Sequence, residues 1–178
     1  MTKNDILLKA INIISTEGYD KLTLSSLAEM LGVKKASIYY HFNSKEDIII
    51  ALYENAKKLL TKFTFYIDFS LSAEEVLNAV YEHWDMIYQD REFAPYLSLL
   101  EQRYMVDDEA LNISSSLDLM IDAQSDAVID NLIERKKLFF NDKKLLSRLF
   151  SATAKDSLKK GESENFINSF VSSFSHWL

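Results

Sequence analysis

Apolar residues recur every three or four positions along almost the whole chain, which is the period of one face of an α-helix. In the first segment Ile6 and Leu7 are followed by Ala10, Ile11 and Ile13. Three glycines and one proline in 178 residues are too few for sheets joined by tight turns. The sequence therefore predicts an all-α fold of about nine helices. They are expected at about 3–17, 24–31, 35–41, 45–69, 72–88, 95–104, 109–137, 142–160 and 162–178.

Several functional classes are excluded by what the chain lacks. It has no cysteine, so disulfide bonds, thiol nucleophiles and thiolate metal sites are absent. None of its three histidines has a glutamate three positions earlier, as a di-iron bundle needs, and no metalloprotease, phosphate-loop or Gly-x-Ser-x-Gly motif occurs. We therefore expect no enzyme, no cofactor and no metal. The N-terminus shows no signal-peptide pattern and no apolar run is long enough for a membrane span, so we expect a cytoplasmic protein without membrane contact.

The charges are unevenly distributed along the chain. Residues 1–50 hold six basic and six acidic residues, whereas the rest holds 14 basic and 21 acidic ones and so carries the whole net charge of −7. Phosphate contacts come from Lys and Arg, so an acidic protein binds nucleic acid with only part of its surface. The distribution fits a neutral head that contacts DNA at one end of an acidic body, although many acidic proteins bind no nucleic acid.

Residues 23–42, TLSSLAEMLGVKKASIYYHF, have the pattern of a helix-turn-helix. This motif needs a small residue where two short helices cross, a residue that tolerates positive φ in the turn, and an apolar anchor on the second helix. Ala28, Gly32 and Ile38 have the spacing that meets these three needs. The other face of the second helix is then free to enter a major groove. The same pattern also arises by chance in helical proteins, and the Tyr-Tyr-His-Phe string alone could belong to a core.

The segment from about Ile6 to Leu52 resembles the N-terminal domain of the TetR family of bacterial repressors. The resemblance rests on Gly18-Tyr19, Leu22-Thr23, Leu27-Ala28, Leu31-Gly32-Val33, Ile38-Tyr39-Tyr40-His41-Phe42 and Lys45-Glu46-Asp47. It covers little more than a quarter of the chain, and the remainder agrees with the family only in length and helical pattern. Lys34 departs from the family, which often has Ser or Thr there. The resemblance implies a three-helix DNA-binding head at 1–46 and a helical regulatory and dimerisation domain at 47–178.

The resemblance also implies which residues contact DNA. Tyr39 and Lys45 are expected on phosphates, and Lys35, Ala36, Ser37 and Tyr40 on base edges. The full expected set is Thr23, Ser25, Lys34, Lys35, Ala36, Ser37, Tyr39, Tyr40, His41 and Lys45. The expected partner is an inverted-repeat operator in double-stranded DNA, bound by a homodimer whose recognition helices lie about 34–36 Å apart.

Two further surfaces are expected on the aromatic-rich body. The resemblance implies a dimer through the last two helices, with Leu149, Phe166, Phe170, Phe174 and Trp177 as candidates, whereas packing within one subunit is the alternative. A small apolar or aromatic effector is expected among Phe63, Tyr66, His83, Trp84, Tyr88, Tyr96, Arg103, Tyr104 and Gln124, with an ordinary core as the alternative. The helix at 45–69 would link this site to the head. The alternative function is a helical adaptor that has lost DNA binding.

Overall fold

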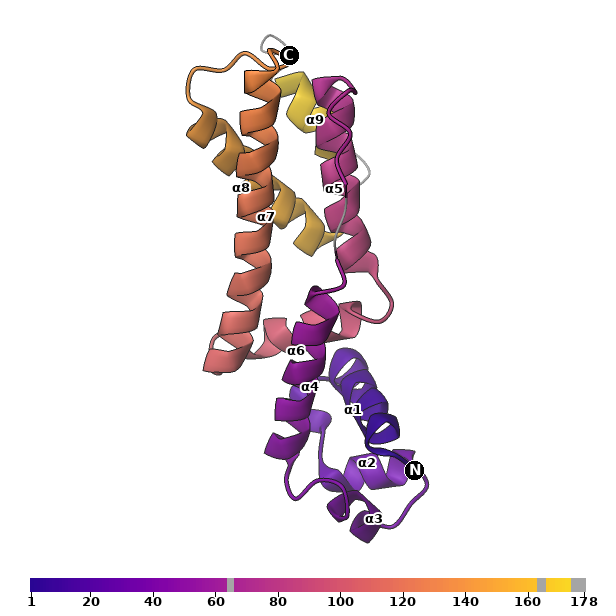
Figure 1. Cartoon of the computed structure of the whole chain (residues 1–178). Helices are drawn as coiled ribbons and strands as arrows, with labels where there is room; N and C mark the ends of the chain where they lie inside the picture. Colours follow the sequence, from indigo (N-terminus) through magenta and orange to yellow (C-terminus); the bar gives the residue numbers. More distant parts are fainter. Residues whose placement is uncertain (64–65, 163–165, 174–178) are drawn as a thin grey trace. The chain divides into compact units, whose positions relative to one another are not determined.

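The computed structural model describes residues 1–63, 66–162 and 166–173, and these residues form nine α-helices, a short 3-10 helix and no strand (Figure 1). This confirms the all-α class and the number of helices. The elements are α1 (Lys3–Glu17), η1 (Tyr19–Lys21), α2 (Leu24–Met30), α3 (Lys35–Tyr39), α4 (Lys45–Leu60), α5 (Ala73–Gln89), α6 (Ala94–Arg103), α7 (Asp108–Glu134), α8 (Lys143–Lys160) and α9 (Phe166–Ser173).

Several helix ends are fixed by capping residues. The Ser44 hydroxyl accepts a hydrogen bond from the backbone N–H of Asp47 at 3.0 Å, and α4 begins directly after Ser44. The Asp142 carboxylate accepts one from the N–H of Leu145 at 3.0 Å at the start of α8. Gly161 ends α8 in the left-handed conformation, at φ +68°. Local chemistry therefore sets these boundaries.

The fourth helix is shorter than expected. It ends at Leu60, so the expectation of one helix from 45 to 69 that carries Phe63 and Ile67 is wrong. Residues 61–67 read Thr-Lys-Phe-Thr-Phe-Tyr-Ile, a run of β-branched and aromatic residues with low helix propensity. The Thr61 hydroxyl also donates to the carbonyl of Lys58 at 2.7 Å in the last turn. Helix α4 therefore does not include residues 61–69, which were expected to link the effector site to the head.

The other helix bounds differ from expectation by a few residues. α3 ends at Tyr39 rather than His41, and α7 ends at Glu134 rather than at 137. Of the last expected helix, 162–178, the structure describes a helix only from Phe166 to Ser173. Among the described residues, no helix is long and apolar enough to cross a membrane.

The chain divides into two compact units. Unit 1 comprises residues 1–63 and 90–115, and unit 2 comprises the described residues of 64–89 and 116–178. Helix α7 therefore belongs to unit 1 as far as Ser115 and to unit 2 beyond it. The two units are defined by which residues pack together. The expected boundary between residues 46 and 47 separates a DNA-binding head from a regulatory domain, and it stays a prediction.

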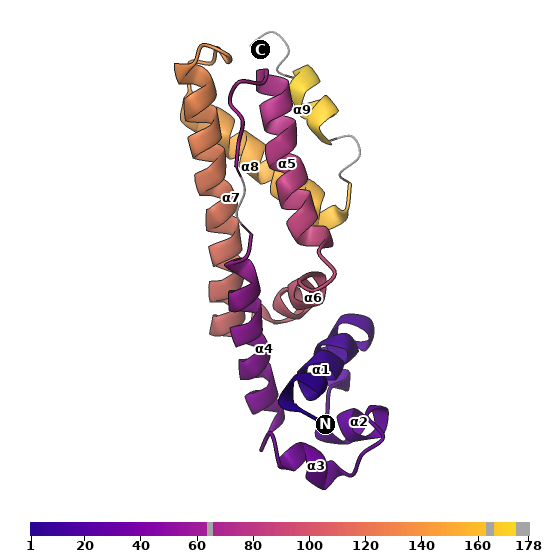
Figure 2. The ribbon, with the colours of Figure 1, turned by 45° about the vertical axis from the view of Figure 1, so that its right-hand side comes forward.

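Unit 1 has an aliphatic core in which α1 is central. Helix α1 packs against α2, α4 and α6 (Figure 2). Its side chains Ile6, Ile13 and Ile14 are fully buried, as are Leu52 of α4 and Leu99 of α6. The three helices of the expected head are therefore packed together with α4 and α6 in a single compact unit.

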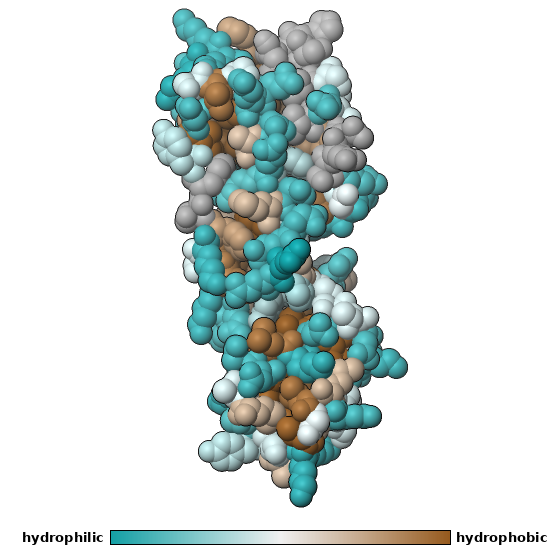
Figure 3. Space-filling view, turned by 90° about the vertical axis from the view of Figure 1, so that its right-hand side faces the viewer, coloured by the Kyte–Doolittle hydropathy of each residue, from teal (hydrophilic) through white to brown (hydrophobic). Residues whose placement is uncertain are grey.

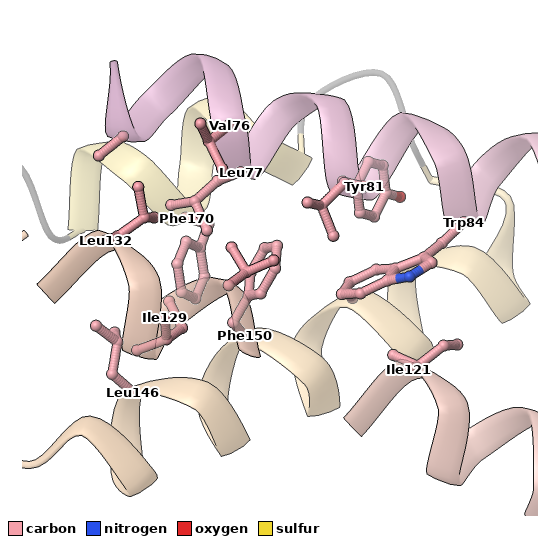
Figure 4. Packing of buried hydrophobic residues seen from close by; sticks show 14 of the residues in the cluster. Val76, Leu77, Tyr81, Trp84, Ile121, Ile129, Leu132, Leu146, Phe150 and Phe170 are labelled. Atoms are coloured by element: carbon pink, nitrogen blue, oxygen red, sulfur yellow. The ribbon is translucent and has the colours of Figure 1, made fainter. Parts of the chain in front are cut away.

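Unit 2 has an aromatic core between α5, α7, α8 and α9 (Figure 4). Trp84 and Phe150 are fully buried, and their ring centroids lie 5.3 Å apart. Phe170 of α9 reaches the same cluster, 5.1 Å from Phe150, and Phe166 stacks on Tyr81 at 4.4 Å. On the face shown in Figure 3, hydrophilic side chains cover most of the surface and apolar ones form separate patches.

Candidate DNA interface

The crossing of α2 and α3 has the geometry that the sequence pattern predicts. Gly32 lies in the turn at φ +65°, and a Cβ added there would meet no heavy atom within 4 Å. Glycine is therefore required for its backbone conformation and not for space. Ala28 is buried and accepts a 3.0 Å hydrogen bond from the N–H of Val33, and Ile38 anchors α3 with no exposed surface. The turn at Gly32 and the buried Ala28 and Ile38 therefore set how the two short helices cross.

Helix α2 begins with a reciprocal cap. The N–H of Ser26 donates to the Thr23 hydroxyl at 2.9 Å, and the N–H of Thr23 donates to the Ser26 hydroxyl at 3.0 Å. Thr23 and Ser25 are both exposed, as a phosphate contact requires. The structure therefore gives Thr23 a capping role that is independent of DNA, and its contact with a phosphate stays a prediction.

The outward face of α3 and its flanking residues is open. Lys34, Lys35 and Ala36 are exposed, and so are 47% of Tyr39 and 85% of Tyr40. Exposed aromatic side chains that are neighbours on one face mark a candidate interaction surface. No acidic residue occurs between Lys34 and Lys45, so the charged side chains of this stretch are all basic.

Aromatic contacts order part of this face. The Lys35 Nζ lies 5.7 Å from the centroid of the Tyr39 ring, and the Tyr40 and His41 rings meet edge to face at 4.9 Å. Ser37 and His41 are half-buried at the edges of the face. The structure therefore brings together the expected residues from Lys34 to His41, around a helix whose opposite side is sealed by Ile38 and Phe42.

Lys45 differs from the other expected DNA contacts. Its Nζ donates to the backbone carbonyl of Tyr19 at 2.7 Å and lies 3.7 Å from the centroid of the Tyr19 ring. Burial lowers the pKa of Lys45, partly offset by the nearby Asp20 carboxylate. The ammonium is thus already held by protein groups, and its contact with a phosphate stays a prediction.

One basic residue that the sequence pattern did not indicate lies beside the residue that follows the α3 face, Phe42. The Lys3 Nζ lies 5.4 Å from the centroid of the Phe42 ring, at the residue that seals the end of the α3 segment. The Thr2 cap, which starts α1 at Lys3, could have indicated a fixed position for this side chain. The approach to Phe42 depends on tertiary packing, which local spacing does not encode.

The residues expected around an effector are divided between the two units. Unit 1 holds Phe63, Tyr96, Arg103 and Tyr104, whereas unit 2 holds Tyr66, His83, Trp84, Tyr88 and Gln124. In unit 2 the Trp84 indole N–H donates to the side-chain oxygen of Gln124 at 2.6 Å. Burial lowers the pKa of His83 and raises that of Tyr88.

Within unit 1 the expected effector residues have other neighbours. Phe63 meets Phe93 edge to face at 5.6 Å, and the Arg103 guanidinium lies over Tyr19 at 4.2 Å. Tyr96 is buried and Tyr104 is exposed. Tyr66, in unit 2, is 89% exposed. Among the expected residues, Trp84 and Gln124 are joined by a hydrogen bond, and Tyr88 packs against the hydrophobic cluster that contains Trp84. Among the described residues, no group of three or more metal-ligating side chains occurs.

The residues expected at the dimer interface also have different surroundings. Leu149 is 37% exposed on the outside of α8, next to Leu145, which is 48% exposed. Phe170 is only 7% exposed and Phe166 stacks on Tyr81, so packing within unit 2 occupies both. Phe174 and Trp177 lie outside the described residues.

Comparison with known proteins assigns a family to the N-terminal segment. Residues 6–52 match the family model of bacterial regulatory proteins of the tetR family. The biofilm operon icaADBC HTH-type negative transcriptional regulator IcaR of Staphylococcus epidermidis is 39% identical over 69 residues, which cover 39% of this chain and 34% of IcaR. IcaR of Staphylococcus aureus is 48% identical over 46 residues, or 26% of this chain and 25% of IcaR. The chain therefore matches about a third or less of the length of these curated relatives.

Solved structures match nearly the whole chain, at low identity. GusR of Salmonella enterica is 16% identical, with a TM-score of 0.62 over 98% of this chain and 93% of that one. PfmR of Thermus thermophilus is 20% identical, with a TM-score of 0.63 over 98% and 94%. A transcriptional regulator of Saccharomonospora viridis, solved in complex with choline, is 19% identical, with a TM-score of 0.64 over 96% and 95%. These structures share the fold. The N-terminal segment at residues 6–52 is thus similar in sequence to bacterial regulatory proteins of the tetR family, and the chain as a whole is similar to such regulators in fold.

Proposed function

We propose that this protein is a transcriptional repressor that reads an operator with α3. The observation that carries the proposal is the open basic and aromatic face of Lys34 to Tyr40, on a helix anchored by the buried Ile38. A helix of this kind enters the major groove with its first residues toward the bases. The relative from Staphylococcus epidermidis is described as a negative transcriptional regulator, which favours repression over activation.

Within this face we propose a division of roles. Tyr39 and Lys45 hold phosphates, while Lys35, Ala36, Ser37 and Tyr40 meet base edges. The remaining expected residues lie around them and contact the phosphate backbone of the DNA; they are Thr23, Ser25, Lys34 and His41.

The proposal is tested by footprinting the purified protein on the DNA that flanks its own gene, followed by affinity measurements over a range of salt concentrations. Lys34→Ala removes one exposed cation, so the slope of log K against log salt becomes shallower by about 0.9 for each lost phosphate contact. Lys58→Ala, an exposed lysine near the far end of α4, is the matched control and should leave the slope unchanged.

Substitutions at the base-contacting positions and the salt dependence of binding together distinguish the repressor from the helical adaptor. Ser37→Ala or Ala36→Ser should change preference among operator variants, because base contacts carry sequence information and phosphate contacts do not. A protein that protects no DNA, or whose affinity ignores salt, would refute the repressor and favour the helical adaptor.

We also propose that the operator is an inverted repeat bound by a homodimer. The support is the apolar face that α8 leaves open at Leu145 and Leu149. Leu149→Glu should shift the protein toward monomer in sedimentation analysis and weaken operator binding, since two linked heads bind more tightly than one. Leu119→Glu, at a position 66% exposed on α7, is the control. A dimer that survives Leu145→Glu and Leu149→Glu together would contradict this interface.

We further propose that a small apolar or aromatic effector releases the operator and is held in unit 2. The support is the group of Trp84, Tyr88 and Gln124, whose aromatic rings suit a flat or quaternary ammonium ligand. The choline in the similar Saccharomonospora viridis structure makes choline chloride the first compound to titrate against the protein–operator complex, followed by flat aromatic compounds. An operator affinity that stays unchanged at saturation with a bound compound would refute release, because an effector acts only through its differential affinity.

A further inference from the structure

Tyr19 lies between two cations that come from different parts of unit 1. The Lys45 Nζ is 3.7 Å from the centroid of its ring, and the Arg103 guanidinium carbon is 4.2 Å from it. Lys45 opens α4, directly after the α3 segment, whereas Arg103 ends α6. Two positive groups repel each other, so they share one ring only where its electron-rich surface and further acceptors stabilise both. For Lys45 that further acceptor is the Tyr19 carbonyl at 2.7 Å.

Arg103 is held in place by the start of α7. Its guanidinium lies 3.5 Å from the Asp107 carboxylate, and both side chains are less than a quarter exposed. Asp107 also accepts hydrogen bonds from the Tyr53 hydroxyl at 3.1 Å and from the backbone N–H of Glu109 at 3.0 Å. The acceptor is thus itself oriented by α4 and by the first turn of α7, so Arg103 has a fixed position over Tyr19.

The neighbouring residue on α6 fixes the same segment by hydrogen bonds. The Gln102 side-chain oxygen accepts the N–H of Tyr19 at 2.7 Å, and its amide donates to the carbonyl of Ile14 at 3.2 Å. Ile14 lies in the last turn of α1, and Gly18 between them has φ +103°. Gln102 therefore holds the end of α1 and the start of η1 against α6.

These contacts hold both elements that flank the helix-turn-helix in the sequence. The chain leaves α1 through Tyr19, passes through α2 and α3, and returns at Lys45. We propose that Arg103 and Gln102 are positioning residues for DNA binding: through Tyr19 and Lys45 they fix the recognition helix relative to α6 without contacting DNA. This inference rests on the proposed function and assigns Arg103 a role other than effector contact.

The test measures operator affinity, its salt dependence and backbone hydrogen exchange in the full-length protein. Arg103→Leu removes the stacking and the ion pair, and Gln102→Leu removes both amide contacts. Each should weaken operator binding about tenfold, and the salt slope should be the same in the two variants, because neither side chain is itself a phosphate contact. The N–H of Tyr19 should exchange faster in Gln102→Leu, whereas those of α8 should not change.

Three controls separate positioning from a loss of folding. Glu101→Leu replaces an exposed neighbour on α6 and should bind like the wild type. Arg103→Lys keeps the charge over Tyr19 and should recover most of the affinity, which a purely structural defect would not allow. Thermal unfolding of each variant shows that the comparison is made between folded proteins.

The outcomes are distinct. Wild-type affinity in both Arg103→Leu and Gln102→Leu would overturn the inference and leave the repressor function intact. A salt slope that becomes shallower in Arg103→Leu but not in Gln102→Leu would also overturn it, because Arg103 would then contact a phosphate directly. Failure of the wild type to bind any operator would refute the proposed function itself.

Discussion

The two compact units both combine apolar packing with directional bonds, but they place the directional bonds differently. In unit 1, segments far apart in the sequence are joined by directional hydrogen bonds, such as those that Gln102 makes with Tyr19 and Ile14. In unit 2, α5, α7, α8 and α9 share an aromatic core centred on Trp84 and Phe150. Directional bonds fix angles between helices, whereas apolar packing mainly requires the right volume. In unit 1 these bonds lie at Tyr19, in the segment that leads into α2 and α3, so they hold the orientation of the part that presents α3.

Unit 2 adds a regular row of polar pairs at the edge of its core. Aspartates recur every four residues along α7, and each faces a lysine or serine of the antiparallel α8. The pairs are Asp118–Lys159, Asp122–Lys155, Asp126–Ser147 and Asp130–Lys143. Like charges four residues apart repel within a helix, so α7 depends on α8 to neutralise them. These pairs set the register of the two helices but are exposed enough to contribute little energy each.

The largest effect is expected from a loss of volume in unit 2. Trp84→Ala removes a fully buried indole and its 2.6 Å hydrogen bond to Gln124. Loss of such a side chain lowers the free energy of unfolding by about 3–5 kcal/mol. Met86→Ala, on the same helix but 59% exposed, should change it by less than about 0.5 kcal/mol. Urea unfolding followed by circular dichroism measures both, and equal losses would show that unit 2 is not organised around this core.

Two glycines permit a matched comparison between the units. Gly32 in the turn before α3 and Gly161 at the end of α8 have φ +65° and +68°, and neither would bring a Cβ near another atom. Alanine at either position should therefore cost about 1–2 kcal/mol of stability, for its backbone conformation alone. Only Gly32→Ala should also weaken operator binding, because it changes the angle between α2 and α3. Equal loss of operator binding in both variants would remove the distinction between the units.

Sequence reasoning predicted local features well and contacts between distant residues poorly, for a physical reason. The turn at Gly32 and the anchor Ile38 are determined by neighbours in sequence, so spacing and residue type were sufficient. The contact between Gln102 and Tyr19 joins residues 83 positions apart, and nothing in the local pattern of either residue indicates it. Phe170 was expected at a dimer interface and is instead buried in unit 2, because an apolar stripe shows that a face is covered but not what covers it.

The row of polar pairs should have a smaller effect than either glycine. Lys155→Met removes the 2.8 Å ion pair with Asp122. Burial raises the pKa of the Asp122 carboxyl, but the hydrogen bonds from Lys155 and Ser151 lower it, and the overall shift is downward. We expect a loss of about 0.5–1 kcal/mol at low salt that shrinks as salt is added. Lys160→Met breaks an exposed pair within α8, with Asp156 at 2.7 Å, and should cost less. Equal and salt-independent losses would mean that the pairs between α7 and α8 contribute no electrostatic register.

The smallest expected effect is a pH response that belongs to unit 2. Burial in α5 lowers the pKa of His83 below its usual 6.5, so the unfolded chain takes up a proton at this residue more readily than the folded one. The stability that His83 contributes is therefore complete above 6.5 and is lost as the pH falls through the lower pKa of the folded state. In unit 1 the pKa of Asp107 is raised by burial but lowered overall by its hydrogen bonds, so the response of Asp107 should begin only below the usual 3.8.

Urea unfolding between about pH 7.5 and 5.5 should show the free energy of unfolding fall in the wild type and fall less in His83→Gln. A His83→Gln protein with an unchanged pH response in this window would show that the acid sensitivity comes from elsewhere in the chain.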